Sequence, residues 1–376
     1  LEEDQFDTIL AGQREVGLSS EAWAIGRSWV TYQSDLPRAS QYPCHPIPEE
    51  TLRSLPNLAA VERMVNDFDA LGYPLKRRAY HDTQIYNWLG MNRHYAGSRG
   101  WSHTSPWVRA HPELHLRNRD GSADGSRVEY HFEETRSERL DICLESSRFG
   151  PDGLVLGWCR QTPHAGYHPD ILKQYEEESG IDPLSLGLSD NAKHTAWLKW
   201  RCEHGTTRFM RDLRRAMSDL EEETGHHVPI VARVPSEGFY FNLAMGMDVE
   251  TWIEEELVDE LQLDPLENRG GDSAALGSQD VTPYVEACRE HGILVLGGVN
   301  GTTATRDLKR GAAGEELKGP DYAPTVGLRR AIGLAEADVD GIEVYESELF
   351  AYVTHARWLI PLFGDPEKAR AFLDNS

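Results

Sequence analysis

The chain has 376 residues and a formal net charge of -24, with 62 acidic residues against 38 basic ones. This charge argues against nucleic acids and anionic membrane surfaces as partners, because both would repel the protein. The five cysteines are scattered and form no CxxC pair, so the sequence gives no sign of a disulfide framework. No apolar run approaches the roughly 18 residues that a membrane span needs.

The first residues, Leu-Glu-Glu-Asp-Gln, include neither a basic segment nor an apolar one. No signal peptide is therefore evident, although a signal that had been removed would leave no trace. We expect a soluble protein, with the choice between bacterial cytoplasm and periplasm left open, as is the oligomeric state.

Short apolar runs alternate with amphipathic segments along the chain, which favours an α/β fold with a parallel sheet. An eighth strand, either before residue 1 or too divergent to recognise, would close a (β/α)8 barrel of the TIM type. No composition shift divides the chain, so we expect one barrel domain over residues 1–376. The seven runs predicted to be strands are Glu21–Gly26, Pro74–Tyr80, Leu154–Cys159, Pro229–Val234, Glu260–Leu263, Ile293–Gly297 and Gly341–Tyr345.

Between these runs, helical periodicity and capping residues predict helices. We expect helices at Asn57–Leu71, Glu133–Ser147 and Ala192–Glu223. Asp248, Asp280 and Asp365 suit the N-caps of three further helices.

Three long irregular regions interrupt the pattern, namely Thr83–Ser126, Glu267–Gln279 and Asn300–Pro324. Loops of such length in a compact domain are usually lids or binding loops. Each follows a predicted strand, so in a barrel all three would lie on the active face.

The segment Asp340–Glu348 carries most information, because a short buried strand ends there in several carboxylates. Asp152–Arg160 opens with the same Asp-Gly-aliphatic pattern, which indicates repeated βα units. An acid within a strand, as at Glu343, is costly to bury unless it is paired or used.

Alternation along the strands sorts side chains into those that face the barrel interior and those that face the helices. Glu343 and Tyr345 then face inward, as do Gln262 and Asp264. Arg233 lies among apolar residues, where its charge needs a carboxylate partner or an anionic ligand. Further residues at the predicted strand ends would reach the barrel mouth, namely His81, Asp82, Trp158, Arg160, Glu237 and Asn300.

Two carboxyl groups on opposite walls of a pocket suit the cleavage of a glycosidic bond. One protonates the leaving oxygen, and the other attacks the carbon or activates water. The pattern favours Glu343 and Asp264 as this pair, with Glu237 as the main substitute. The aromatic faces of Trp158 and Tyr345 suit sugar rings.

Three cationic or potentially cationic residues at the mouth, Arg160, Arg233 and His81, would hold the substrate. In so acidic a protein they indicate an anionic sugar, such as a uronate or a sulfated sugar. His81, Asp82 and Asn300 complete the predicted substrate-binding set.

Each candidate also has a purely structural interpretation. Glu343 and Arg233 could form a buried ion pair, and Asp264, which precedes Pro265, could only initiate a turn. Glu237 could lie on the surface of a loop.

The sequence predicts neither a metal nor a cofactor. His111 and His115 are four residues apart, but Pro112 and the surrounding loop disfavour a helical ligand pair. No HExxH, GxGxxG, P-loop or GxSxG motif occurs.

Several segments together carry a family resemblance, namely Arg109–His115, Tyr130–Arg136, Gly150–Arg160, Gly246–Ile253 and Leu257–Asp259. Over about residues 60–350 the chain resembles the glycosyl-hydrolase-like, "family 10-like" barrels of bacteria. The resemblance implies a TIM-type barrel and a glycosidase. Relatives usually carry Asp where this chain has Gly157, which implies that the role of that Asp is lost or has moved.

We therefore expect a glycoside hydrolase that acts on a bacterial or algal carbohydrate. One alternative is a non-catalytic carbohydrate-binding barrel, which Gly157 makes plausible. The other is a barrel lyase or isomerase with His81 as its base.

Overall fold

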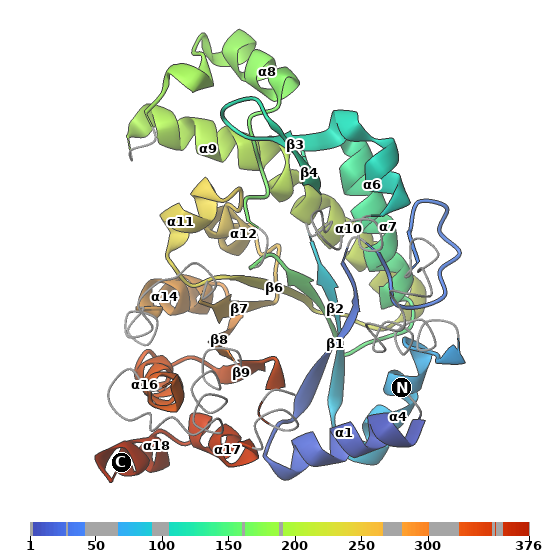
Figure 1. The fold of residues 1–376 in the computed structure, drawn as a ribbon, viewed down its shortest axis with the longest axis vertical. Helices are drawn as coiled ribbons and strands as arrows, with labels where there is room; N and C mark the ends of the chain where they lie inside the picture. Colours follow the sequence, from blue (N-terminus) through green and yellow to red (C-terminus); the bar gives the residue numbers. More distant parts are fainter. Residues whose placement is uncertain are drawn as a thin grey trace, which may run out of the picture.

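The computed structural model describes residues 3–27, 29–41, 67–91, 105–159, 162–187, 191–265, 280–300, 323–347, 350 and 356–375. Its centre is a curled sheet of seven parallel strands in the order β1-β2-β5-β6-β7-β8-β9 (Figure 1). The strands are β1 (Ser20–Gly26), β2 (Gln84–Gly90), β5 (Gly153–Gly157), β6 (Ile230–Pro235), β7 (Glu260–Asp264), β8 (Leu294–Asn300) and β9 (Gly341–Tyr345).

Several helices, among them α7 (Glu133–Ser147), α10 (Thr206–Thr224) and α14 (Thr282–Glu290), lie on the outer, convex side of this sheet (Figure 1). The helices are α1 (Glu3–Glu15), α4 (Gly72–His81), α6 (Pro106–Ala110), α7 (Glu133–Ser147), α8 (Pro169–Ser179), α9 (Ala192–His204), α10 (Thr206–Thr224), α11 (Phe239–Ala244), α12 (Val249–Glu254), α14 (Thr282–Glu290), α16 (Ala323–Glu336), α17 (Ile360–Phe363) and α18 (Pro366–Asp374). An antiparallel pair, β3 (His115–Arg117) and β4 (Ala123–Val128), lies with α8 and α9 at one end of the molecule (Figure 1).

The α/β fold with a parallel sheet is confirmed, and the sheet has the form of a half-barrel. Within the described ranges no eighth strand joins β9 to β1. Instead, α1 reaches from one edge of the sheet to the other: the amide of Gln13 donates to Ser347 Oγ at 3.2 Å, just after β9. Arg357 pairs with Glu15 at 3.1 Å. The single-domain expectation stays a prediction.

One predicted strand is wrong. Pro74–Tyr80 lies within helix α4, and the strand is β2 ten residues further on, in a region expected to be irregular. Pro74 fits the first turn of a helix, where its missing N–H costs nothing. The region Thr83–Ser126 also contains α6, β3 and β4. The other two predicted loops lie almost entirely outside the described residues.

The predicted helices agree well where they are described. Helix α7 has the expected bounds, and Asp248 and Asp365 accept hydrogen bonds as N-caps. The long helix predicted over residues 192–223 is instead two helices broken at Gly205, whose backbone leaves the helical region. Periodicity did not reveal this break. Most of Asn57–Leu71 lies outside the described residues.

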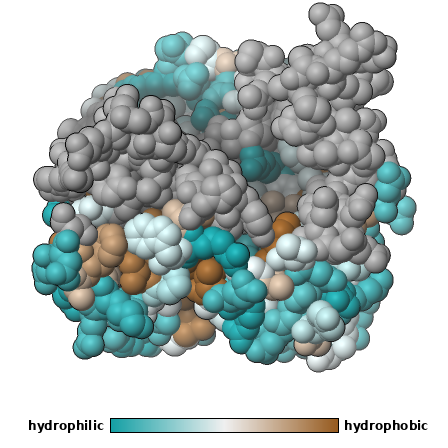
Figure 2. Space-filling model, turned by 60° about the horizontal axis from the view of Figure 1, so that its bottom comes forward, coloured by the Kyte–Doolittle hydropathy of each residue, from teal (hydrophilic) through white to brown (hydrophobic). Residues whose placement is uncertain are grey.

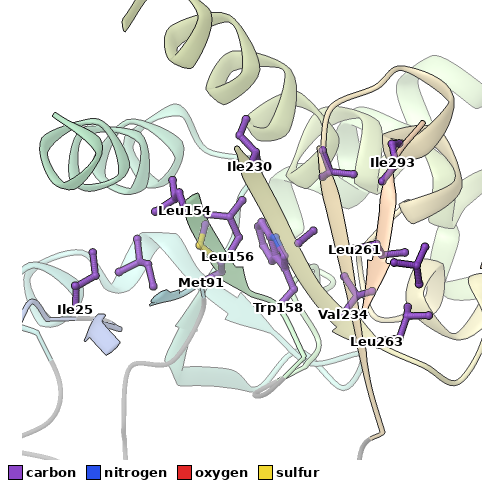
Figure 3. Close-up of a cluster of buried hydrophobic side chains, with 14 of the residues drawn as sticks. Ile25, Met91, Leu154, Leu156, Trp158, Ile230, Val234, Leu261, Leu263 and Ile293 are labelled. Atoms are coloured by element: carbon purple, nitrogen blue, oxygen red, sulfur yellow. The ribbon is translucent and has the colours of Figure 1, made fainter. Parts of the chain in front are cut away.

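The main core lies between the outer face of the sheet and the helices. Leu154 and Leu156 of β5, Ile230 of β6 and Leu261 of β7 belong to it (Figure 3). A smaller cluster of Trp88, Val155 and Val231 lies on the opposite, inner face of the sheet. Strands β5, β6 and β7 are buried on both faces, and their side chains alternate between the outer and the inner face of the sheet.

The surface agrees with the acidic composition: hydrophilic residues predominate on the face that Figure 2 shows, with scattered hydrophobic ones between them. Among the described helices, none combines the length and hydropathy needed to cross a membrane.

Three aspartates stand directly before β5, β7 and β9 and hold these strands in register. Each carboxylate accepts a hydrogen bond from a backbone N–H of the neighbouring strand, and each aspartate N–H donates to that residue's carbonyl. We call these contacts aspartate clamps. They join Asp152 to Ile85 (2.8 and 2.9 Å), Asp259 to Ile230 (2.7 and 2.8 Å) and Asp340 to Val295 (2.8 and 2.8 Å). All three lie where the parallel strands begin.

Replacing a clamp should destabilise the fold. Asp340→Ala leaves the N–H of Val295 without its acceptor, so we expect a loss of about 1–3 kcal/mol in the free energy of unfolding. Urea denaturation measures this loss. The control is Glu336→Ala, which removes an exposed ion pair with Arg370 and should cost less than about 1 kcal/mol. Equal losses in both variants would contradict the clamp.

Candidate active site

A fully buried guanidinium joins three strand ends on the inner face of the sheet. The side chain of Arg233, from β6, is 1% exposed, and its Nη2 lies 2.5 Å from Oδ2 of Asp264 at the end of β7. Its Nε lies 3.4 Å from Oε1 of Glu343 in β9. Its Cζ lies 3.8 Å from the ring centroid of Tyr345. We call these four residues the Arg233 cluster.

The cluster forms because the strands alternate and run parallel. Residues two apart on one strand share a face, and the carboxyl ends of parallel strands lie at one edge of the sheet. The backbone also makes room for it. A Cβ at Gly298 of β8 would lie 2.9 Å from Oδ1 of Asp264, so only glycine lets this carboxyl lie against β8. Asn300 pairs in register with Tyr345 and is 8% exposed.

The two carboxyl groups of the cluster differ in how readily they lose their protons. Burial raises the pKa of Glu343 to about 7, and Arg233 only partly opposes this rise. Burial also raises the pKa of Asp264, again opposed by Arg233. One guanidinium balances one carboxylate. Because Asp264 makes the shorter contact, it retains the charge, and Glu343 holds a proton near neutral pH.

Glu237, which follows β6, belongs to the same group of acids. The thiol of Cys159 lies 3.5 Å from Oδ2 of Asp264. Burial raises the pKa of Cys159, and the charges of Asp264 and Glu237 raise it further, so both acids lie within electrostatic reach of one thiol. Glu237 is half-buried, whereas Asp264 is 2% exposed.

A second cation near the cluster was not predicted. Arg330, from helix α16, is 4% exposed and donates to Ser236 Oγ at 3.3 Å and to the carbonyl of Gly298 at 3.4 Å. Its charge lowers the pKa of Asp264, against the larger effect of burial. The available signal was an arginine among the apolar residues of a helix, since Leu328, Ala331 and Leu334 are all buried.

Two predicted site residues lie at the opposite end of the sheet. His81 and Asp82 end helix α4 and precede β2, so they lie where the strands begin. His81 Nε2 is 2.8 Å from Asp7, and Asp82 pairs with Arg14 at 2.5 Å. The sequence placed both residues at the barrel mouth because Pro74–Tyr80 was predicted to be a strand. The structure shows that this placement is wrong. This removes the basis for a lyase or isomerase with His81 as its base.

The predicted position of Trp158 at the barrel mouth is also wrong. Strand β5 ends at Gly157, and Trp158 turns to the helix side, where it is 0% exposed (Figure 3). Its ring lies 5.2 Å from that of Tyr130 and 5.5 Å from that of Trp252. Trp158 is therefore a core residue. Arg160 lies outside the described residues.

The proposal of an anionic sugar loses its support. Of its three cations, His81 lies at the wrong end of the sheet, and Arg233 already faces two carboxyls. Among the residues that the structure describes, no group of three or more His, Cys, Asp or Glu side chains could hold a metal ion.

No family model matches this chain, and no curated protein matches it. The family 10-like resemblance thus stays a prediction. Among solved structures, the catalytic domain of a β-amylase from Paenibacillus polymyxa aligns over 98% of this chain and 95% of its own, with a TM-score of 0.51 and 9% identity. A glycoside hydrolase family 18 N-acetylglucosaminidase from Paenibacillus barengoltzii covers 80% of this chain and 87% of its own, with a TM-score of 0.40 and 13% identity. At these identities the likeness to the β-amylase shows a shared fold.

The raised pKa of Glu343 makes the stability of the fold depend on pH. Below pH 4.5 the group is protonated in both the folded and unfolded states. Between pH 4.5 and 7 the folded state alone holds the proton, so the free energy of unfolding falls as pH rises, by roughly 3 kcal/mol over this window. Glu343→Gln, which cannot titrate, should lose this part of the pH dependence. Urea denaturation at pH 4.5 and 7.5 compares the two proteins, and identical pH dependence would refute the assignment.

Proposed function

We propose that this protein is a glycoside hydrolase and that Glu343 is its general acid. The observation that carries the proposal is a buried carboxyl with a pKa of about 7, joined through one guanidinium to a second carboxyl at the strand ends. An acid catalyst works best when its pKa lies near the working pH. The shared fold with a β-amylase catalytic domain is consistent with this chemistry, but the site itself is the argument.

Glu343 donates its proton to the oxygen of the bond that breaks, so that the departing sugar leaves as an alcohol. The second carboxyl then attacks the sugar carbon or takes a proton from water. Oε2 of Glu343 and Oδ1 of Asp264 are buried and make no hydrogen bond to the described residues, so both atoms retain capacity for a substrate.

Asp264 and Glu237 are the two candidates for the second carboxyl. Asp264 is ionised beside Arg233 and is held in one orientation, which suits a nucleophile. Its 2% exposure argues against direct contact with a sugar, unless the substrate displaces its neighbours. Glu237 is half-buried and lies on a loop after β6, so it reaches a substrate more easily.

We propose a neutral sugar as the substrate. Arg233 and Arg330, two of the cations at the described strand ends, both contact protein oxygens already. Three acids lie near them, so the site as a whole repels anions.

Glu343→Gln keeps the shape of the side chain but removes its proton. We expect turnover of unactivated oligosaccharides to fall by at least about a hundredfold. Aryl glycosides with a dinitrophenolate leaving group need no proton, so the variant should lose much less activity on them. The control is Glu336→Gln on the outer surface of α16, which should keep full activity.

Three outcomes would count against the proposal. An equal loss on both substrate types would show that Glu343 is not the general acid. Full activity of Glu343→Gln would remove it from the mechanism altogether. An unsaturated, ultraviolet-absorbing product would identify a lyase. Asp264→Asn and Glu237→Gln, tested on the same two substrates, identify the second carboxyl as the one whose loss slows both reactions.

The pH dependence gives a separate test. Because Glu343 must be protonated, kcat/KM should fall as pH rises through about 7. In Glu343→Gln, kcat/KM should no longer fall as pH rises through about 7, whereas any pH dependence that belongs to the second carboxyl should remain. An unchanged alkaline limb in the variant would assign that pKa to another group.

A further inference from the structure

Trp88 is a large aromatic side chain on the inner face of the sheet, nearer to the carboxyl end of β2 than Tyr86, which packs in the same cluster. Trp88 of β2 packs against Val155 and Val231, so its indole extends from β2 across β5 towards β6. It is 8% exposed. Sequence reasoning missed Trp88 because β2 was placed in a loop.

Gly157 makes room for this indole. A Cβ at Gly157 would lie 2.5 Å from Cζ2 of Trp88 and 3.2 Å from its Nε1. A Cβ at Gly90 would lie 3.4 Å from Cη2 of Trp88, an ordinary contact, and closer to Arg27, at 3.0 Å from its Cγ. The two glycines are register partners at the ends of β2 and β5. Any larger residue at position 157 would displace the ring, so the position of the Trp88 indole requires glycine at position 157.

The indole lies over β5, the strand that pairs with the strand of Arg233. Gly157, which the ring covers, is the register partner of Arg233. On the β1 side the guanidinium of Arg27 lies 5.6 Å from the ring centroid of Trp88. Trp88 therefore lies at the carboxyl end of the sheet, on the same face as Asp264 and Glu343.

The indole N–H of Trp88 has no acceptor among the described residues, although it is buried. A buried donor without a partner costs free energy, and tryptophan N–H groups usually find a partner when buried. The core residues Trp158 and Trp197 also have an indole N–H without an acceptor among the described residues. Trp88 differs from them in its place on the inner face, at the carboxyl end of the sheet, where this donor can meet a ligand with an acceptor.

We propose that Trp88 is a substrate-binding residue whose N–H donates to a hydroxyl or carbonyl oxygen of the sugar unit next to the bond that breaks. This inference rests on the proposed function, since it takes the ligand to be a carbohydrate. Because the indole N–H can only donate a hydrogen bond, its partner on the sugar is an oxygen with a free lone pair.

Trp88→Phe removes the donor and keeps a ring. Binding is measured by calorimetry with malto-, cello-, xylo- and chito-oligosaccharides, in a Glu343→Gln background that limits turnover. For the sugar that binds the parent protein best, we expect Trp88→Phe to weaken the affinity about tenfold. Trp23→Phe is the matched control. Its indole N–H also lacks an acceptor among described residues, but its ring packs against Phe6 on the helix side, so affinity should not change.

Gly157→Ala tests the same contact without altering Trp88. Its methyl group intrudes on the ring, so this change should weaken binding in the parent but add little to Trp88→Phe. Additive effects of the two substitutions, or unchanged affinity in both single variants, would overturn the role of Trp88. Absence of binding to every oligosaccharide by the parent would overturn the proposed function and this inference with it. Sugar binding that Trp88→Phe leaves intact would overturn this inference alone.

Discussion

The chemistry of this protein depends on one guanidinium buried between two carboxyl groups. Removing Arg233 from water is expensive, and its contacts with Asp264 and Glu343 offset that cost only if all three groups keep their geometry. The same contacts draw the ends of β6, β7 and β9 together. Burial raises the pKa of both carboxyl groups, and the charge of Arg233, joined at Asp264 by that of the nearby Arg330, opposes this rise only in part. The requirement to bury Arg233 thus creates an acid that is protonated near neutral pH.

Strand parity predicted the centre of the site from the sequence. Whether Glu343, Asp264 and Arg233 face inward depends only on alternation within each strand, and a parallel sheet then brings them together. The same logic failed for Trp158, because β5 ends two residues earlier than expected and the chain leaves the strand there. For His81 the placement failed because Pro74 lies in the first turn of helix α4 and does not mark a strand. The error lay in the end of a strand for Trp158 and in the type of element for His81.

Other features were beyond any local pattern. Trp88 and Gly157 are 69 residues apart in sequence, and nothing near either residue indicates that an indole occupies the space above the glycine. Gly298 and Asp264 are a second such pair. In each pair a missing side chain on one strand admits a large or charged side chain from its neighbour. Such complementarity belongs to the packed sheet. A glycine in one sequence read alone therefore does not identify the residue it accommodates.

The aspartate clamps keep the residues that hold the strands in register away from the residues of the candidate active site. Asp152, Asp259 and Asp340 fix the strand pairs where the strands begin, whereas the acids and Trp88 lie where they end. Changes in the loops that follow β6, β7 or β8 therefore leave the anchoring of the strands untouched. Under the proposed function, replacing a loop at that edge of the sheet should change which sugar binds while the strands keep their register.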